Sequence, residues 1–190
     1  MPYFETRMNA ARVASVFRLP RLLSDDDPGV RAMAILRLPH KHAERCIKDP
    51  DRSVRIAVAH RLDLGKLLPM MRDEDSYVRT IAARRAEAGA LPVMLTDSDP
   101  EIRRIVARRI GMRWLDRFRN DDDPLVRREA ALRRPALFIQ DPDFRVRHTV
   151  AEAGCMAEAE ALLDDPEDII RETAAARLAK LREGATPHVH

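Results

Sequence analysis

The sequence predicts an all-α protein built as a row of about seven short helical repeats. A motif with two acids and a closing arginine returns along the chain, first as DDDPGVR at residues 25–31 and last as DPEDIIR at residues 165–171. The motif arginines are Arg31, Arg55, Arg79, Arg103, Arg127, Arg147 and Arg171, spaced by 24 residues at every step except one of 20. A fixed period of this length is typical of a solenoid. Since aromatic residues make up only 4% of the 190 residues, the core must consist largely of small and aliphatic side chains, which favour helices.

The second acid of each motif is placed to cap a helix. Proline follows it at positions 28, 100 and 124, which is the order of an N-cap and a first helical residue. The predicted caps are Asp27, Asp51, Asp75, Asp99, Asp123 and Asp143, and Glu167 takes this place in the last repeat. Backbone N–H groups at a helix N-terminus favour carboxylates without any ion, so we interpret the acids as structural and predict no metal site.

Apolar residues recur one position before the motif arginine and three, four and seven positions after it, which is one face of a helix. The position four after the arginine is occupied by Ile35 and then by Ala59, Ala83, Ala107, Ala131, Ala151 and Ala175. Small side chains in one column let consecutive helices approach closely. Larger residues are therefore expected to clash there.

The segments between these helices are too short for a comfortable second α-helix, and Pro69 and Pro92 interrupt two of them. We expect single turns or 3₁₀ pieces in these places. Cys46 stands where Met70 stands in the next repeat, so it is predicted to be a core residue, as is Phe118.

We predict a single repeat domain over residues 1–182, with a degenerate N-terminal cap at 1–24, repeats at 25–182 and a flexible tail at 183–190. The two cysteines lie far apart and lack C-x-x-C companions, so neither a disulfide framework nor a cysteine-ligated cofactor is expected. No apolar run approaches the ~18 residues of a membrane span. The expectation is a cytoplasmic protein that needs no cofactor and does not contact a membrane.

A 24-residue unit with the pattern D-x-[DE]-x-x-[VI]-R, an alanine-rich helix and a truncated second helix resembles the leucine-rich repeat variant (LRV) family, a relative of the HEAT-like α-solenoids. The resemblance covers roughly residues 20 to 180. It implies α and 3₁₀ segments stacked into a right-handed α-solenoid. By analogy with HEAT-like arrays, it also implies that the motif arginines bridge to acids of a neighbouring repeat and form a buried ladder.

The same resemblance implies a link to nitrogen fixation, and the chain looks like the small nitrogenase-associated factors of that setting. The founding LRV protein carries a cysteine-rich iron–sulfur segment ahead of its repeats. Here the residues before Asp25 contain no cysteine, so such a cluster is not expected and the link rests on the repeats alone.

A second arginine column lies six residues after the motif arginine, and it is broken only by Ala153. It consists of Arg37, Arg61, Arg85, Arg109, Arg133 and Arg177, with Arg84, Arg108 and Arg134 beside it. One interpretation is that these cations favour helix C-termini. The other is a basic stripe that docks an acidic protein surface or a phosphate backbone.

The segment GMRWLDRFRN at residues 111–120 places the only tryptophan among arginines, a combination that is frequent in interface hot spots. We therefore predict an exposed anchor at Trp114. The partner-binding candidates are Arg84, Arg85, Arg108, Arg109, Arg113, Trp114, Arg117 and Arg133.

Three functions are compatible with the residues. The leading hypothesis is a non-catalytic solenoid that binds another protein, as an accessory or maintenance factor of a nitrogen-fixation component such as nitrogenase. Nucleic-acid binding through the arginine stripe is an alternative, but a net charge of only +3 argues against it. A HEAT-like lyase acting on a cofactor or chromophore is a third, although no catalytic residue is predicted because no phosphate loop or nucleophile motif is present.

Overall fold

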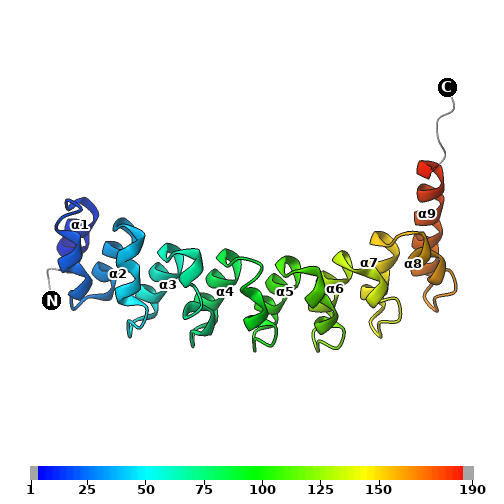
Figure 1. The fold of residues 1–190 in the computed structure, drawn as a ribbon, viewed down its shortest axis with the longest axis horizontal. Coiled ribbons are helices and arrows are strands. Elements are labelled where there is room, and N and C mark those ends of the chain that lie inside the picture. Colours follow the sequence, from blue (N-terminus) through cyan, green and yellow to red (C-terminus); the bar gives the residue numbers. More distant parts are fainter. Residues whose placement is uncertain (1–3, 186–190) are drawn as a thin grey trace, which may run out of the picture. The chain divides into compact units, whose positions relative to one another are not determined.

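The computed structural model describes residues 4–185, and every regular element in that range is a helix. α-Helices alternate with 3₁₀ segments, which confirms the predicted all-α repeat fold (Figure 1). The structure falls into two compact units, Met1–Met94 and Leu95–His190. The single domain predicted for residues 1–182 stays a prediction.

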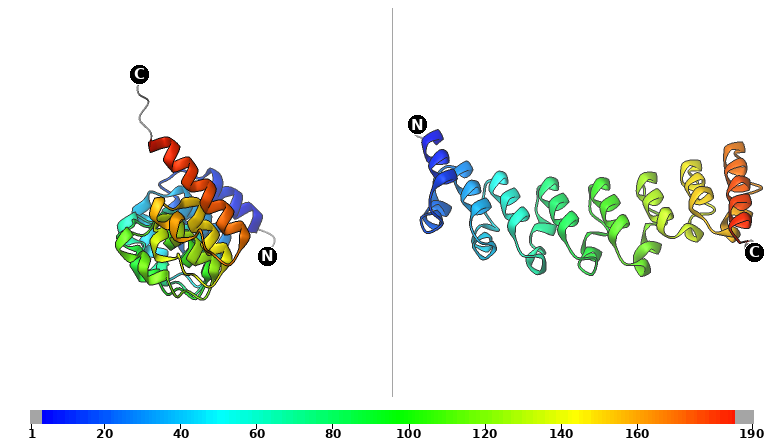
Figure 2. Two further views of the ribbon diagram at one scale, coloured as in Figure 1. Left: turned by 90° about the vertical axis from the view of Figure 1, so that its right-hand side faces the viewer. Right: turned by 90° about the horizontal axis from the view of Figure 1, so that it is seen from above.

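The first unit contains α1 (Phe4–Val13), η1 (Leu19–Ser24), α2 (Pro28–Arg37), η2 (His40–Cys46), α3 (Arg52–Arg61), η3 (Leu64–Lys66), η4 (Met70–Arg72), α4 (Ser76–Arg85) and η5 (Leu91–Met94). The second unit contains α5 (Pro100–Arg109), η6 (Met112–Phe118), α6 (Pro124–Arg133), η7 (Pro135–Leu137), α7 (Phe144–Ala153), α8 (Met156–Ala161) and α9 (Asp168–Ala185). Within each unit the α-helices lie side by side, with the short segments and turns along one edge (Figures 1 and 2).

The last repeat departs from the predicted pattern in two places. Its short segment, α8, is a six-residue α-helix rather than a 3₁₀ piece, because the sequence MAEAEA favours a helix and Glu158 forms a capping box with Cys155. α9 continues for 18 residues, whereas α2 to α7 each have ten. It runs through the strong helix formers of AAARLAKLRE, ends at Ala185 and therefore includes residues 183–185 of the predicted tail. Residues 186–190 of that tail lie outside the described residues.

The core follows the predicted helical face. Val30, Val54, Val78 and their counterparts before each motif arginine have no exposed surface, and neither do most of the alanines four positions after it. Cys46 and Phe118 are buried, as predicted. Ala175 on α9 is the exception in its column, because it is exposed.

Enlarging the alanine column should separate the helices. Ala59→Leu is expected to lower the free energy of unfolding by about 1–3 kcal/mol, because Ala59 has no exposed surface and the added carbons must displace a neighbour. Ala175→Leu is the matched control at the same repeat position, and it should change stability by less than about 0.5 kcal/mol. Urea unfolding followed by circular dichroism measures both; equal losses would contradict close packing as the reason for the small residues.

Candidate functional site

The second acid of each motif caps its helix. Asp27 accepts hydrogen bonds from the backbone N–H groups of Gly29 (2.8 Å) and Val30 (3.2 Å). The side chains of Asp51, Asp75, Asp99, Asp123 and Asp143 likewise accept from N–H groups at the start of α3, α4, α5, α6 and α7. These six carboxylates therefore satisfy backbone donors that have no partner within their helices.

The motif arginine joins consecutive repeats. The Nε and Nη2 groups of Arg31 each donate to one carboxylate oxygen of Asp49 at 2.8 Å, while Nη1 donates to the carbonyls of Asp25 and Asp26 in its own turn. The same two-point contact forms between Arg103 and Asp121, Arg127 and Asp141, and Arg147 and Asp165.

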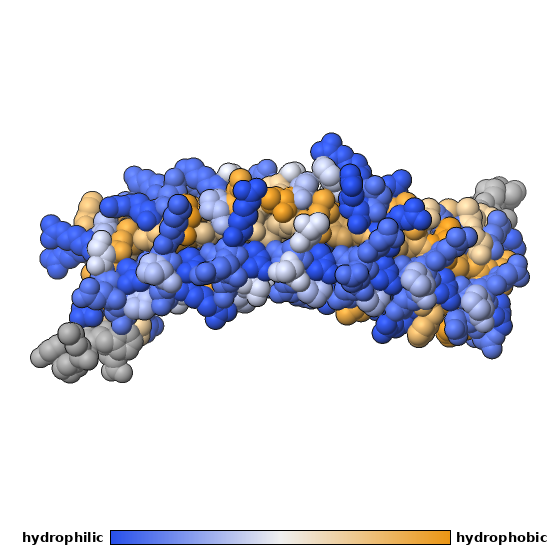
Figure 3. Space-filling view, turned by 90° about the horizontal axis from the view of Figure 1, so that it is seen from below, coloured by the Kyte–Doolittle hydropathy of each residue, from blue (hydrophilic) through white to orange (hydrophobic). Residues whose placement is uncertain are grey.

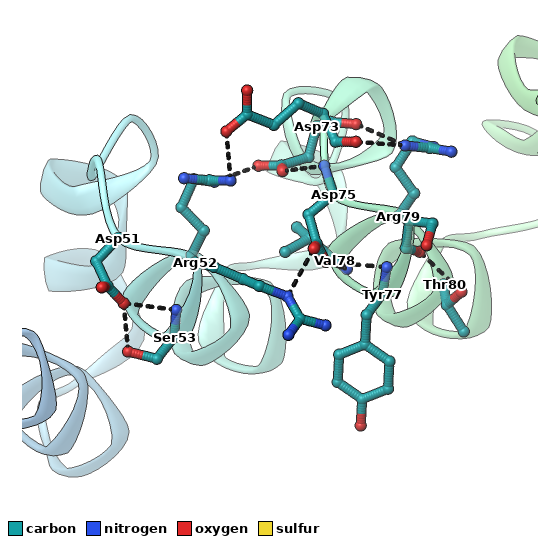
Figure 4. Close-up of polar contacts among 12 residues, drawn as sticks. Asp51, Arg52, Ser53, Asp73, Asp75, Tyr77, Val78, Arg79 and Thr80 are labelled. Atoms are coloured by element: carbon teal, nitrogen blue, oxygen red, sulfur yellow. Dashed lines mark hydrogen bonds and ion pairs between the residues drawn. The ribbon is translucent and has the colours of Figure 1, made fainter.

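The contact between α3 and α4 is a variant. Arg55 Nε donates to Asp73 (2.9 Å), but its Nη2 donates to the adjacent Glu74 (2.8 Å). Figure 4 shows this region, with Arg52 reaching the capping carboxylate of Asp75 at 2.6 Å. Three ion pairs, two from Arg55 and one from Arg52, therefore connect α3 to the turn and N-cap that precede α4.

The ladder carboxylates come from the first acid of each motif, which the predicted site residues did not include. They include Asp49, Asp73, Asp121, Asp141 and Asp165. Each also accepts the backbone N–H of the second acid, as Asp49 does from Asp51 at 2.9 Å. In the sequence these acids could have been found by their recurrence six residues before the arginine. Only the folded chain shows which of the two acids joins the ladder and which caps the helix.

The ladder is largely withdrawn from water, since the side chains of these pairs are between 2% and 15% exposed. The hydrogen bond to Asp49 raises the pKa of Arg31, and the corresponding bonds raise the pKa of the other ladder arginines. Burial pushes the pKa of Asp165 upward, but hydrogen bonds from Arg147 and from the Glu167 N–H outweigh it, so the pKa is lowered. Both members of the Arg147–Asp165 pair therefore remain charged.

The ion pair between the motif arginine and the ladder aspartate also forms across the 20-residue step between Arg127 and Arg147. Arg127 meets Asp141 fourteen residues later, whereas the other pairs are eighteen residues apart. The two hydrogen bonds still form, at 2.8 and 2.9 Å, because the missing residues come from the connection, where η7 has three residues and η6 has seven. The repeat is therefore anchored by its ion pair and not by the length of its connection.

The second arginine column binds backward along the chain. Arg85 donates to the carbonyls of Ala59 (2.5 Å) and Leu62 (2.8 Å) at the C-terminus of α3, and Arg133 donates to those of Ala107 (2.9 Å) and Ile110 (2.6 Å). Comparable bonds run from Arg37 to Ala11, from Arg61 to Leu38 and from Arg177 to Gly154. Each guanidinium therefore satisfies end carbonyls of the preceding helix, which have no partner within it.

This role corrects the expectation for Arg85 and Arg133 as partner-binding residues. Both are half-buried, and burial lowers the pKa of Arg85. The need to satisfy carbonyls at the end of the preceding helix also explains why the column is broken at Ala153. The preceding connection is short, and the N–H of Leu137 already donates to the carbonyl of Arg134 at 3.2 Å, so no arginine is needed there.

The remaining candidates differ in what they contact. Arg84 and Arg109 are exposed, whereas Arg108 donates to Glu129 at 2.5 Å. That bond lowers the pKa of Glu129, which also lies 3.7 Å from Arg104. Arg108 is therefore held in an ion pair between α5 and α6.

The candidates on η6 form a surface of their own. Arg113, Trp114, Asp116 and Arg117 line one shallow depression, and the Arg113 guanidinium lies 5.5 Å from the centre of the Trp114 ring. Within residues 4–185, no carboxylate forms an ion pair with Arg113 or Arg117. Trp114, predicted as an exposed anchor, is half-buried.

Hydrophilic side chains cover most of one face of the units, with apolar patches between them (Figure 3). In the described part of the chain, no three His, Cys, Asp or Glu side chains form a group that could hold a metal ion. None of the helices described is long and apolar enough to cross a bilayer.

Comparison with known proteins identifies a close structural relative. The solved structure described as a leucine-rich repeat variant with a novel repetitive protein structural motif is 34% identical, with a TM-score of 0.81 over 93% of this chain and 77% of that one. An uncharacterized 27.7 kDa protein in the nifB 3′ region of Rhodobacter capsulatus is 77% identical over 43 residues, which is 23% of this chain and only 18% of that protein. Human deoxyhypusine hydroxylase aligns at 20% identity over 94% of this chain and 78% of that one, with a TM-score of only 0.26. No protein-family model matches the chain.

Removing a ladder carboxylate should be far more costly than removing its neighbour. Asp121→Ala leaves the Arg103 guanidinium, only 15% exposed, without its counter-charge, and should lower the free energy of unfolding by about 3–5 kcal/mol. Asp122→Ala removes the same charge from an exposed position one residue away, so a change below about 0.5 kcal/mol is expected. Thermal and urea unfolding of both variants test this, and similar losses would refute a structural role for the ladder.

Acid should weaken the cap of α7. Hydrogen bonds from the side chain and backbone of Arg145 lower the pKa of Asp143 to about 2, against about 3.9 for an unfolded aspartate. Because the folded pKa is the lower one, the stabilisation is complete above about pH 4 and is lost as the pH falls towards 2. The difference in unfolding free energy between the wild type and Asp143→Asn should therefore shrink over this interval. A difference that stays constant with pH would contradict the assignment.

Proposed function

Because this chain belongs to the leucine-rich repeat variant family, we propose that it is a non-catalytic solenoid that binds another protein, as an accessory or maintenance factor of nitrogen fixation. Solenoids present extended surfaces to partners. The acids and arginines that recur in this chain are engaged in capping helices and joining repeats. Catalysis is accordingly not part of the proposal.

The observation that carries the proposal is the η6 surface. Arg113 and Arg117 are exposed and form no ion pair in the described range, and Trp114 supplies a large ring between them. Tryptophan and arginine contribute disproportionately to binding energy in protein interfaces, where a ring fills a pocket and the guanidinium groups meet carboxylates. The surface fits a partner with acidic groups around an apolar pocket.

The link to nitrogen fixation is supported by the Rhodobacter capsulatus relative, whose name places it in the nifB 3′ region. We propose a nitrogenase component as the client and the cytoplasm as the place of binding.

Affinity purification from cells grown with and without fixed nitrogen tests the client. The wild-type chain should capture a nitrogenase-related protein from cells without fixed nitrogen, and Trp114→Ala combined with Arg113→Ala and Arg117→Ala should abolish that capture. Tyr77→Ala is the matched control, since Tyr77 is also half-exposed beneath an arginine, Arg52, at 5.8 Å. Recovery of no nitrogenase-related protein by the wild type would refute the proposed client. Capture that persists in the triple variant would refute the surface.

A further inference from the structure

Grooves recur between consecutive turns on the edge of the array. One lies in the first unit between residues 47–50 and 69–74, and comparable grooves in the second unit lie between 95–98 and 117–122 and between 139–142 and 161–166. Each is lined by a motif arginine and by ladder carboxylates. The grooves therefore share the residues of the ladder. The residues at their edges, which we call the rims, differ from one groove to the next.

The rims differ at the residue just before the ladder acid. The groove of the first unit has Lys48 and Arg72 at these two places. The last groove of the second unit has Gln140 and Asp164 at the corresponding places. Since the Arg147–Asp165 pair forms as well as the Arg55–Asp73 pair, a basic rim is not required for stability. The positive charges of Lys48 and Arg72 are therefore available to bind a ligand.

Both rim cations are exposed, and neither forms an ion pair with a carboxylate in the portion of the chain that the structure describes. Further exposed cations stand on the preceding short segments: Arg21 on η1 and Lys41 and Arg45 on η2. Lys66 differs, because it is bonded to Glu44. The first unit thus presents unpaired basic side chains from successive repeats along one edge.

The floor of the groove is partly apolar. Ile47, Pro50, Pro69 and Met70 line it between the two rim cations. Glu74 also lines it, but its carboxylate accepts from Arg55. A ligand for this groove should combine carboxylates with small apolar groups.

The spacing favours an extended peptide. Packed helices stand roughly 8–10 Å apart, so cations on successive repeats recur at about that distance. A polyproline II segment has three residues per turn and advances about 9 Å per turn, so acidic residues at every third position would meet them in register. Nucleic acid fits less well, because no aromatic side chain lines the groove for base stacking.

We propose that the groove of the first unit, with Lys48 and Arg72 on its rim, binds an extended acidic segment of a partner protein that has an acid at every third residue. The inference rests on the proposed protein-binding function, but it assigns the contact to the first unit, whereas η6 belongs to the second. It also specifies the chemistry of the bound segment.

A fluorescein-labelled synthetic peptide of repeated Glu-Pro-Ala units tests this with the full chain, by fluorescence anisotropy at low and high salt. The wild type should bind it, and salt should weaken the binding. Lys48→Gln with Arg72→Gln should weaken it by on the order of tenfold, and the Gln-Pro-Ala peptide should not bind. Arg119→Gln with Arg134→Gln removes the same charge from two exposed arginines of the second unit. It is the matched control and should leave the affinity unaltered. Circular dichroism establishes that both double variants are folded.

Three outcomes would overturn the inference. The wild type could fail to bind the peptide; the Lys48 and Arg72 substitutions could leave its affinity unchanged; or oligodeoxythymidylate of equal charge could bind more tightly and displace it, which would make the groove a nucleic-acid site. Because the peptide is synthetic, these results do not depend on capture of a nitrogenase component. Failure of the client proposal and failure of this one are therefore distinguishable.

Discussion

The two-point ion pair between a motif arginine and the ladder aspartate of the next repeat is the contact on which the architecture depends. A single repeat offers little more than one amphipathic helix and a short segment, which cannot bury a core alone. The arginine ties its own turn to the following one, and the aspartate receives both that guanidinium and a backbone N–H of its own repeat. Each repeat is therefore stabilised by its contacts with the neighbouring repeats, as in other solenoid proteins.

The two arginine columns act in opposite directions along the chain. The motif arginines reach forward to a carboxylate, while the second column reaches back to the end carbonyls of the preceding helix. Arginine suits both tasks because its planar fork can meet two acceptors at once. Neither column is free for a partner, so a basic stripe in the sequence is not by itself a binding surface.

Residues that interrupt the periodicity are therefore the better guide to function. Trp114 with its arginines occurs in one repeat only, and the basic rim at Lys48 and Arg72 is replaced by neutral or acidic residues in the second unit. In both places the structural contacts of the repeat are complete without these side chains. Partner recognition on such a scaffold is expected where the repeat varies, because its fixed positions are engaged in folding.

The sequence by itself determined the repeats, their helices, the capping role of the second acid and the burial of Cys46 and Phe118, because these follow from local spacing and hydrogen bonding within a few residues. Tertiary structure alone decided that the first acid binds the preceding repeat's arginine, that Arg85 and Arg133 face carbonyls, and that Trp114 is half-buried. These contacts join residues 14 to 26 positions apart. Two chemically equal side chains a few residues apart can be told apart only when the fold fixes which of them meets the neighbouring helix.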